Sequence, residues 1–148
     1  MAQASRRTGF ALIEVMIALV IVAITTSLAF ASYRRQLVRS HRIEAVQALL
    51  AAAAEQEKFH LALGRYSDRI DSGVGDERPG LPVASTTTHR KYELVIEYAD
   101  AARFRIVATP LEDGGQGDDL QCRRLSIDES GRREALDASG NDSTSRCW

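Results

Sequence analysis

One carboxylate interrupts an apolar run near the N-terminus. Glu14 lies within residues 10–31, where every other residue is apolar, small or hydroxylated. A helix of about 22 residues spans about 33 Å, which is enough to cross the hydrocarbon core of a bilayer. An ionisable side chain inside such a segment costs roughly 2.5 to 3.5 kcal/mol on insertion scales, so Glu14 is a candidate functional residue. The plainer interpretation is a glutamate near the interface that reaches into the lipid headgroups.

The two cysteines, Cys122 and Cys147, both lie near the C-terminus. An even number of cysteines in a chain with a membrane segment favours one disulfide in an oxidising compartment. Two unrelated thiols are the alternative. A bridge would close a loop of about 26 residues and contribute roughly 3 to 4 kcal/mol to stability.

Enzymatic chemistry finds little support in the sequence. His41, His60 and His89 are scattered over a predicted helix and loop with no metal-ligand spacing, and no serine or cysteine has a visible base partner. We therefore expect no catalytic residue, no metal and no cofactor.

Three aspartates lie among the glycines of residues 110–119: Asp113, Asp118 and Asp119. Oxygen-rich loops of this kind can bind calcium, but the spacing fits no EF-hand. A solvated turn is the simpler interpretation.

A long helix is predicted to carry Glu14. Residues 32–63 lack proline and glycine and are rich in good helix formers. Their apolar positions follow spacings of three, four and seven, which predicts an amphipathic stripe. The stripe comprises Val38, Ala45, Leu49, Ala52, Phe59 and Leu63. Joined to residues 10–31, this segment predicts one helix of about 54 residues, on the order of 80 Å long, ending at Gly64.

The rest of the chain predicts a loop and then a small sheet. Residues 64–90 are rich in glycine, serine, threonine and aspartate, which favours a long loop. From residue 91 the period changes to two, so that residues 91–148 predict an antiparallel sheet of three or four strands that opens with a hairpin. The fold class is therefore α+β, with one long N-terminal helix packed on a small antiparallel sheet.

The N-terminal motif carries a family resemblance. "RRTGF", followed by an apolar run with one acid four residues after the phenylalanine, resembles the class III leader of type IV pilins and pseudopilins. The resemblance implies that residues 1–9 are a leader, that a prepilin peptidase cleaves between Gly9 and Phe10, and that it then N-methylates Phe10. It also implies that Glu14 acts in filament assembly, by pairing with the new amine of a neighbouring subunit.

The later segments resemble PilE-type minor pilins in particular. Residues 42–68 resemble their amphipathic helix and its exit, and the "C…CW" ending resembles their disulfide-bounded C-terminal region, with the cysteines at corresponding places. One departure concerns Ala31, since many pilins have a helix-breaking proline late in the apolar segment.

The resemblance implies a non-enzymatic minor pilin incorporated into type IV pili, which support twitching motility and adhesion. It would wait in the inner membrane as a single-pass protein with its soluble domain in the periplasm, and then move into a surface pilus. The implied partners are major and minor pilins, prepilin peptidase, the inner-membrane assembly platform and lipid.

Two alternatives belong to other functional classes. A type II secretion pseudopilin would share the leader and helix, but the cysteine pair favours the pilus branch. A DNA-uptake pilin would use two basic pairs, which are Arg123 with Arg124 and Arg132 with Arg133. The net charge of −1 and the acidic balance of the C-terminal region argue against a phosphate-binding stripe, so DNA is not an expected partner.

Overall fold

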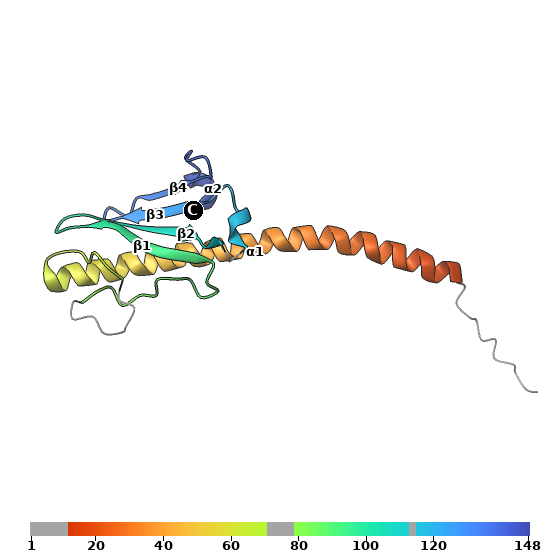
Figure 1. Ribbon diagram of the computed structural model, residues 1–148, viewed down its shortest axis with the longest axis horizontal. Helices are drawn as coiled ribbons and strands as arrows, with labels where there is room; N and C mark the ends of the chain where they lie inside the picture. Colours follow the sequence, from red (N-terminus) through yellow and green to blue (C-terminus); the bar gives the residue numbers. More distant parts are fainter. Residues whose placement is uncertain (1–11, 71–78, 113–114) are drawn as a thin grey trace, which may run out of the picture. The chain divides into compact units, whose positions relative to one another are not determined.

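The computed structural model describes residues 12–70, 79–112 and 115–148. The chain divides into two compact units, Met1–Leu37 and Val38–Trp148. Helix α1, Leu12–Leu63, contributes residues to both units (Figure 1). It ends as predicted at Gly64, which adopts a left-handed φ of 70° and donates its N–H to the carbonyl of His60 at 2.8 Å. The long helix is confirmed, and it continues through Ala31.

The second unit packs the remaining turns of α1 against a four-stranded antiparallel sheet with the order β1-β2-β3-β4 (Figure 1). The strands are β1 (Tyr92–Ala99), β2 (Phe104–Pro110), β3 (Arg124–Asp128) and β4 (Arg133–Leu136). The α+β architecture predicted from the sequence is confirmed.

The hairpin between β1 and β2 forms where the sequence predicts it. Asp100 accepts hydrogen bonds from the backbone N–H groups of Ala102 at 2.7 Å and Arg103 at 2.8 Å. These bonds also hold the pKa of Asp100 below its usual range. A short polar side chain that bonds to the backbone two or three residues on is a standard way to stabilise such a turn.

The core lies between α1 and the inner face of the sheet. Alternate residues of the strands point toward the helix, so the apolar positions of period two meet the apolar stripe of period 3.6. The fully or almost fully buried members from helix and strands are Ala45, Leu49, Ala52, Tyr92, Leu94, Phe104, Ile106, Ala108, Leu125, Ile127 and Ala135.

The predicted helical stripe is wrong at its C-terminal end. Leu63 is 51% exposed, whereas Gln56 is fully buried. The Gln56 amide donates to the carbonyl of Ser67 and accepts from the N–H of Ser67, each at 2.8 Å. The chain therefore folds back over Gln56 after the helix ends, and a polar residue takes a core position because its hydrogen bonds are satisfied.

The alternation predicted for β1 also breaks near its end. The pairing with β2 shifts between Ile96 and Tyr98, which is a β-bulge. An extra residue in one strand moves the following side chains out of the regular alternation. As a result Tyr98 is 42% exposed, although the sequence places it on the buried face with Tyr92 and Leu94.

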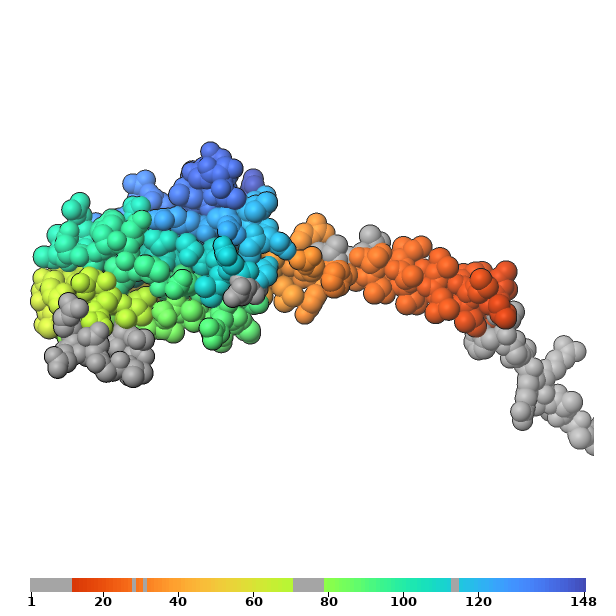
Figure 2. Space-filling view, in the orientation of Figure 1, coloured from red at the N-terminus to blue at the C-terminus, as the bar shows by residue number. Residues whose placement is uncertain are grey.

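Two further short helices lie within the described residues of the second unit. The 3-10 helix η2, Gln116–Asp118, follows the glycine-rich turn after β2. Helix α2, Thr144–Cys147, lies in the tail, which the sequence predicts to be turn-like. Figure 2 shows the C-terminal residues, in blue, on the surface of this unit.

Candidate functional site

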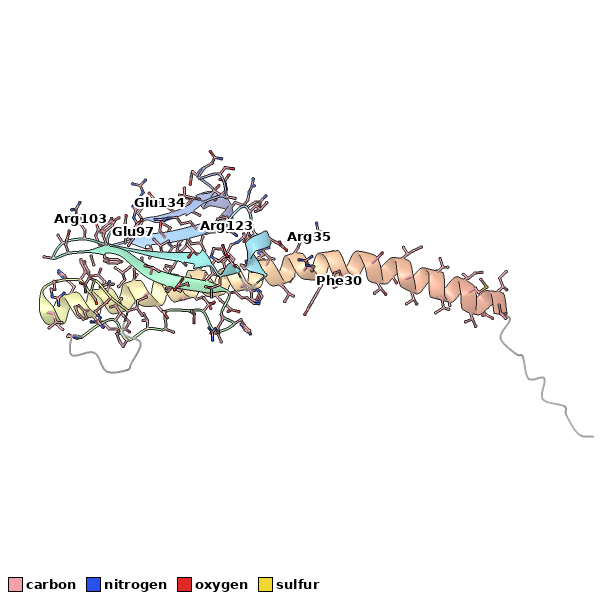
Figure 3. All side chains as sticks on the ribbon, viewed as in Figure 1. Phe30, Arg35, Glu97, Arg103, Arg123 and Glu134 are labelled. Atoms are coloured by element: carbon pink, nitrogen blue, oxygen red, sulfur yellow. A yellow bond between two sulfur atoms is a disulfide. The ribbon has the colours of Figure 1, made fainter. Side chains whose placement is uncertain are left out.

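The described part of the first unit, residues 12–37, is a helix with apolar side chains exposed on every side. Leu12, Ile17 and Ile24 are each more than half exposed, and so is Phe30, which projects from the helix in Figure 3. Within the described part of the chain, α1 is the one helix long and apolar enough to cross a membrane. A helix that is apolar all round needs lipid or other helices as its surroundings.

Glu14 is exposed in the first turn of α1. Its side chain forms no hydrogen bond or ion pair with the side chain or backbone of another described residue. Gly9 and Phe10, the predicted cleavage and methylation positions, lie outside the described residues. The roles of these three residues therefore stay predictions.

The hydroxyl groups in the middle of the apolar segment bond to their own helix. Thr25 donates to the carbonyl of Ile21 at 2.9 Å, Thr26 to that of Val22 at 2.7 Å, and Ser27 to that of Ile24 at 2.8 Å. These bonds satisfy the hydroxyls within one chain and leave the surface of the helix apolar.

A disulfide joins Cys122 to Cys147, with the Cα atoms 5.8 Å apart. Both cysteines are buried and belong to the core cluster. Trp148 follows the bridge and donates its indole N–H to the carbonyl of Glu134 at 2.9 Å, while the Arg133 guanidinium lies 5.4 Å from the indole ring. The bridge fastens the tail to the segment before β3, and the Trp148 contacts fasten it to β4.

The basic residues on the outer face of the sheet are paired with carboxylates. Arg124 forms an ion pair with Glu97 at 2.6 Å, and Arg105 and Arg132 form ion pairs with Glu134 at 3.2 and 3.0 Å. Figure 3 shows Glu97 on β1 and Glu134 on β4. This face of the sheet therefore carries charges of both signs.

The turn after β2 contains a buried polar network that no sequence pattern indicates. The Gln116 amide nitrogen donates to the carbonyl of Val38 and to the hydroxyl of Tyr92, both at 3.0 Å. Asp119 is buried and accepts from the Arg42 guanidinium at 2.8 and 3.0 Å. Burial raises the pKa of Tyr92 to about 12, although the Gln116 hydrogen bond opposes that shift.

The interpretation of residues 110–119 as a solvated turn is therefore wrong for Asp119, whose carboxylate anchors the turn to α1. Asp113 lies outside the described residues. No local pattern could have revealed this ion pair, because its partners are separated by 77 positions in the sequence.

The expectation that the histidines are scattered is wrong for two of them. His41 and His89 lie beside Glu44, and one ligand atom from each of the three residues lies within 4.8 Å of the others. His60 lies apart from this group, since its ring stacks on Tyr66 at a centroid distance of 4.4 Å.

Comparisons with known proteins agree with the geometry. A family model described as "Type IV minor pilin ComP, DNA uptake sequence receptor" matches residues 31–126, and one described as "Prokaryotic N-terminal methylation motif" matches residues 4–30. No curated protein matches the chain significantly.

Two solved pilin structures resemble this one. The non-core minor pilin PilV of Neisseria meningitidis is 15% identical, with a TM-score of 0.51 over 69% of this chain and 89% of its own. A type IV pilin from Shewanella oneidensis is 20% identical, with a TM-score of 0.40 over 65% of this chain and 89% of its own. The PilV likeness supports the fold, and the ComP model matches well over half of the chain. The protein belongs to the ComP family of type IV minor pilins.

Proposed function

We propose that this minor pilin is made with a leader that prepilin peptidase removes between Gly9 and Phe10, after which Phe10 is N-methylated. The processed protein waits in the inner membrane through its apolar helix, with Val38–Trp148 in the periplasm. The assembly platform then moves it into a pilus, where it contacts major and minor pilins. This pilus supports twitching motility and adhesion.

The observation that carries the proposal is the exposed apolar helix with a single carboxylate near its start. Cleavage would create a cationic amine on Phe10, four residues before Glu14, which is one helical turn. In a medium of low dielectric constant the attraction between the two charges is strong, and either charge left unpaired is costly. Pairing between Glu14 and the amine of a neighbouring subunit would therefore select one axial register among the packed helices.

The test compares Glu14→Gln with the wild type in cells that carry pili. We expect Glu14→Gln to be processed normally, to remain in the membrane, and to fall at least tenfold in the sheared pilus fraction. Glu93→Gln removes an exposed carboxylate from β1 and is the matched control, expected to assemble normally. Equal incorporation of Glu14→Gln and the wild type would overturn the pairing role.

A second candidate function is DNA recognition during uptake, since the family model that matches residues 31–126 describes a receptor for DNA uptake sequences. The candidate phosphate-binding groups are the two basic pairs, which are Arg123 with Arg124 and Arg132 with Arg133. A bound phosphate would have to compete with Glu97 for Arg124 and with Glu134 for Arg132. Affinity would then depend steeply on salt, because each phosphate contact contributes a log–log slope of about −0.9.

The discriminating experiment measures binding of labelled duplex DNA by fluorescence anisotropy at 20 and 200 mM salt. Duplexes of unrelated sequences are compared, since a receptor for one uptake sequence must prefer it. Sequence-selective binding that weakens in Arg124→Gln would establish the second function. If no duplex binds at 20 mM salt, DNA recognition is excluded as a function of this chain, and the structural role in the pilus is the function that stands.

A further inference from the structure

We infer that His41, Glu44 and His89 form a binding site for a divalent transition-metal ion, for which Zn²⁺ is the best match. The ion would fasten the turn at residues 87–91 to helix α1. This inference concerns the second unit alone and does not depend on the proposed pilus function.

The donor set has the composition of a zinc site. His41 and Glu44 are three residues apart on α1, so both lie on the same face of the helix. His89 comes from the turn before β1, and its ring centroid is 5.8 Å from that of His41. Two imidazoles and one carboxylate bind Zn²⁺ at about 2.0–2.2 Å and leave a fourth position for water or another ligand.

The distances between the three ligand atoms are close to those around a bound ion, so the side chains need to move only a little. The three ligand atoms lie within 4.8 Å of one another. Around a tetrahedral ion, bonds of about 2.1 Å place ligand atoms roughly 3.4 Å apart. Glu44 Oε1 and His89 Nδ1 are already 2.8 Å apart, and His89 is exposed enough to rotate. Side-chain rotations therefore suffice to close the site.

A buried glutamine prepares His41 as a ligand. The Gln116 side-chain amide donates its two N–H groups to the carbonyl of Val38 and to the hydroxyl of Tyr92. These two bonds orient the amide so that its Oε1 lies 3.3 Å from Nδ1 of His41. Since an amide oxygen only accepts, Nδ1 of His41 must carry the proton. The lone pair then lies on Nε2, and this arrangement, in which the other ring N–H is fixed by a neighbour, is typical of metal-binding histidines.

Glu44 has an oxygen atom in need of a partner. Oε1 contacts His89, but Oε2 is buried and has no hydrogen-bond partner among the described residues. A buried carboxylate oxygen without a partner is costly and is a recognised indication of an ion or water nearby. A simple Glu44–His89 hydrogen bond would account for Oε1 but not for Oε2. A bound cation in contact with this carboxylate would satisfy it.

The turn that carries His89 is held by its own hydrogen bonds. Thr87 Oγ1 accepts from the N–H groups of Lys91 and Tyr92 at 3.2 and 3.1 Å, and Arg90 has a left-handed φ of 51°. His89 is thus presented from a defined turn while its side chain stays 63% exposed, so an ion can reach it.

Glu44 also lines a groove of about 390 Å³ between α1 and the turn. The other walls of this groove include Ala48, Ala51 and Thr86. Space beside one ligand is compatible with the open coordination position that a site with three protein ligands requires.

The test is calorimetric titration of ZnCl₂ into the full-length protein in detergent, purified with a tag that lacks histidine and stripped with a chelator. We expect one ion per chain and a rise in melting temperature on binding. His41→Ala, His89→Ala and Glu44→Gln should each weaken binding at least tenfold. His60→Ala is the matched control, because it removes a histidine outside the cluster, and should bind as the wild type does.

The exposed position of His89 means that its removal leaves the core intact, and circular dichroism without metal verifies the fold of each variant. The absence of saturable binding at one ion per chain would overturn the inference. So would unchanged binding in both His41→Ala and His89→Ala, or an equal loss in His60→Ala, since the ion would then bind elsewhere.

Discussion

Removing the disulfide should cost a large part of the stability of the second unit. Cys122 and Cys147 are 25 positions apart, and both are buried in the core cluster. For a closed loop of that length the chain-entropy relation gives roughly 12 cal/mol/K, which is about 3.5 kcal/mol at 25 °C. A small domain has only 5 to 15 kcal/mol in total, so the loss would bring it close to unfolding.

The assay is urea unfolding of a fragment comprising residues 36–148, which contains the whole core cluster. Trp148 is the single tryptophan and lies next to the bridge, so its fluorescence reports on the tail, while circular dichroism reports on helix and sheet. With a urea m-value of about 1.5 kcal/mol/M, the midpoint should fall by roughly 2 to 3 M on reduction. We also expect the Trp148 transition to precede the dichroism transition in the reduced protein.

The double variant Cys122→Ser/Cys147→Ser is the control for the reductant. It should unfold like the reduced protein and should not respond to reducing agent. A loss below about 1 kcal/mol in the free energy of unfolding, in both the reduced protein and the double variant, would show that the bridge does not restrain the tail.

Three further predictions use the same fragment and urea unfolding. Leu49→Ala should lower the free energy of unfolding by about 2 to 5 kcal/mol because Leu49 is fully buried, whereas Leu50→Ala, at a more exposed neighbouring position, should cost clearly less. Burial raises the pKa of Tyr92 to about 12 from the usual 10, so the phenol ionises first in the unfolded state. The free energy of unfolding therefore falls as pH rises from 10 to 12. In Tyr92→Phe, the decrease in the free energy of unfolding at pH 11 should be smaller by about 1.4 kcal/mol. Burial opposes ionisation of Asp128, but hydrogen bonds from Ser130 outweigh it and hold the pKa of Asp128 below its usual range. The stabilisation that the ionised Asp128 side chain provides is therefore present above about pH 4 and is lost as pH falls through the lowered pKa. The difference in free energy of unfolding between the wild type and Asp128→Asn should be largest above pH 4 and should shrink at lower pH.

The elements of the fold could be predicted because their signals are local. The change of period from 3.6 to two marks where α1 and the strands lie, and Gly64 marks the end of the helix. The errors have physical causes. A β-bulge moved Tyr98 outward, and Gln56 entered the core because Ser67 satisfies its amide.

The polar sites of the second unit could not be predicted, because they depend on tertiary contacts between distant segments. Gln116 and His41 are 75 positions apart, and His89 and Glu44 are 45 apart. Neither pair has a sequence motif. In contrast, the N-terminal motif that carries Glu14 is contiguous, so a single stretch of sequence was enough to identify it.

Processing and incorporation of this minor pilin are tested most directly by mass spectrometry of the N-terminal tryptic peptide from sheared surface filaments. Residues 10–34 form one such peptide, since no lysine or arginine lies between Phe10 and Arg34. We expect this peptide to begin with N-methylated Phe10. A chain that retains the leader, with Met1 or Ala2 as its N-terminus in every fraction, would contradict this expectation.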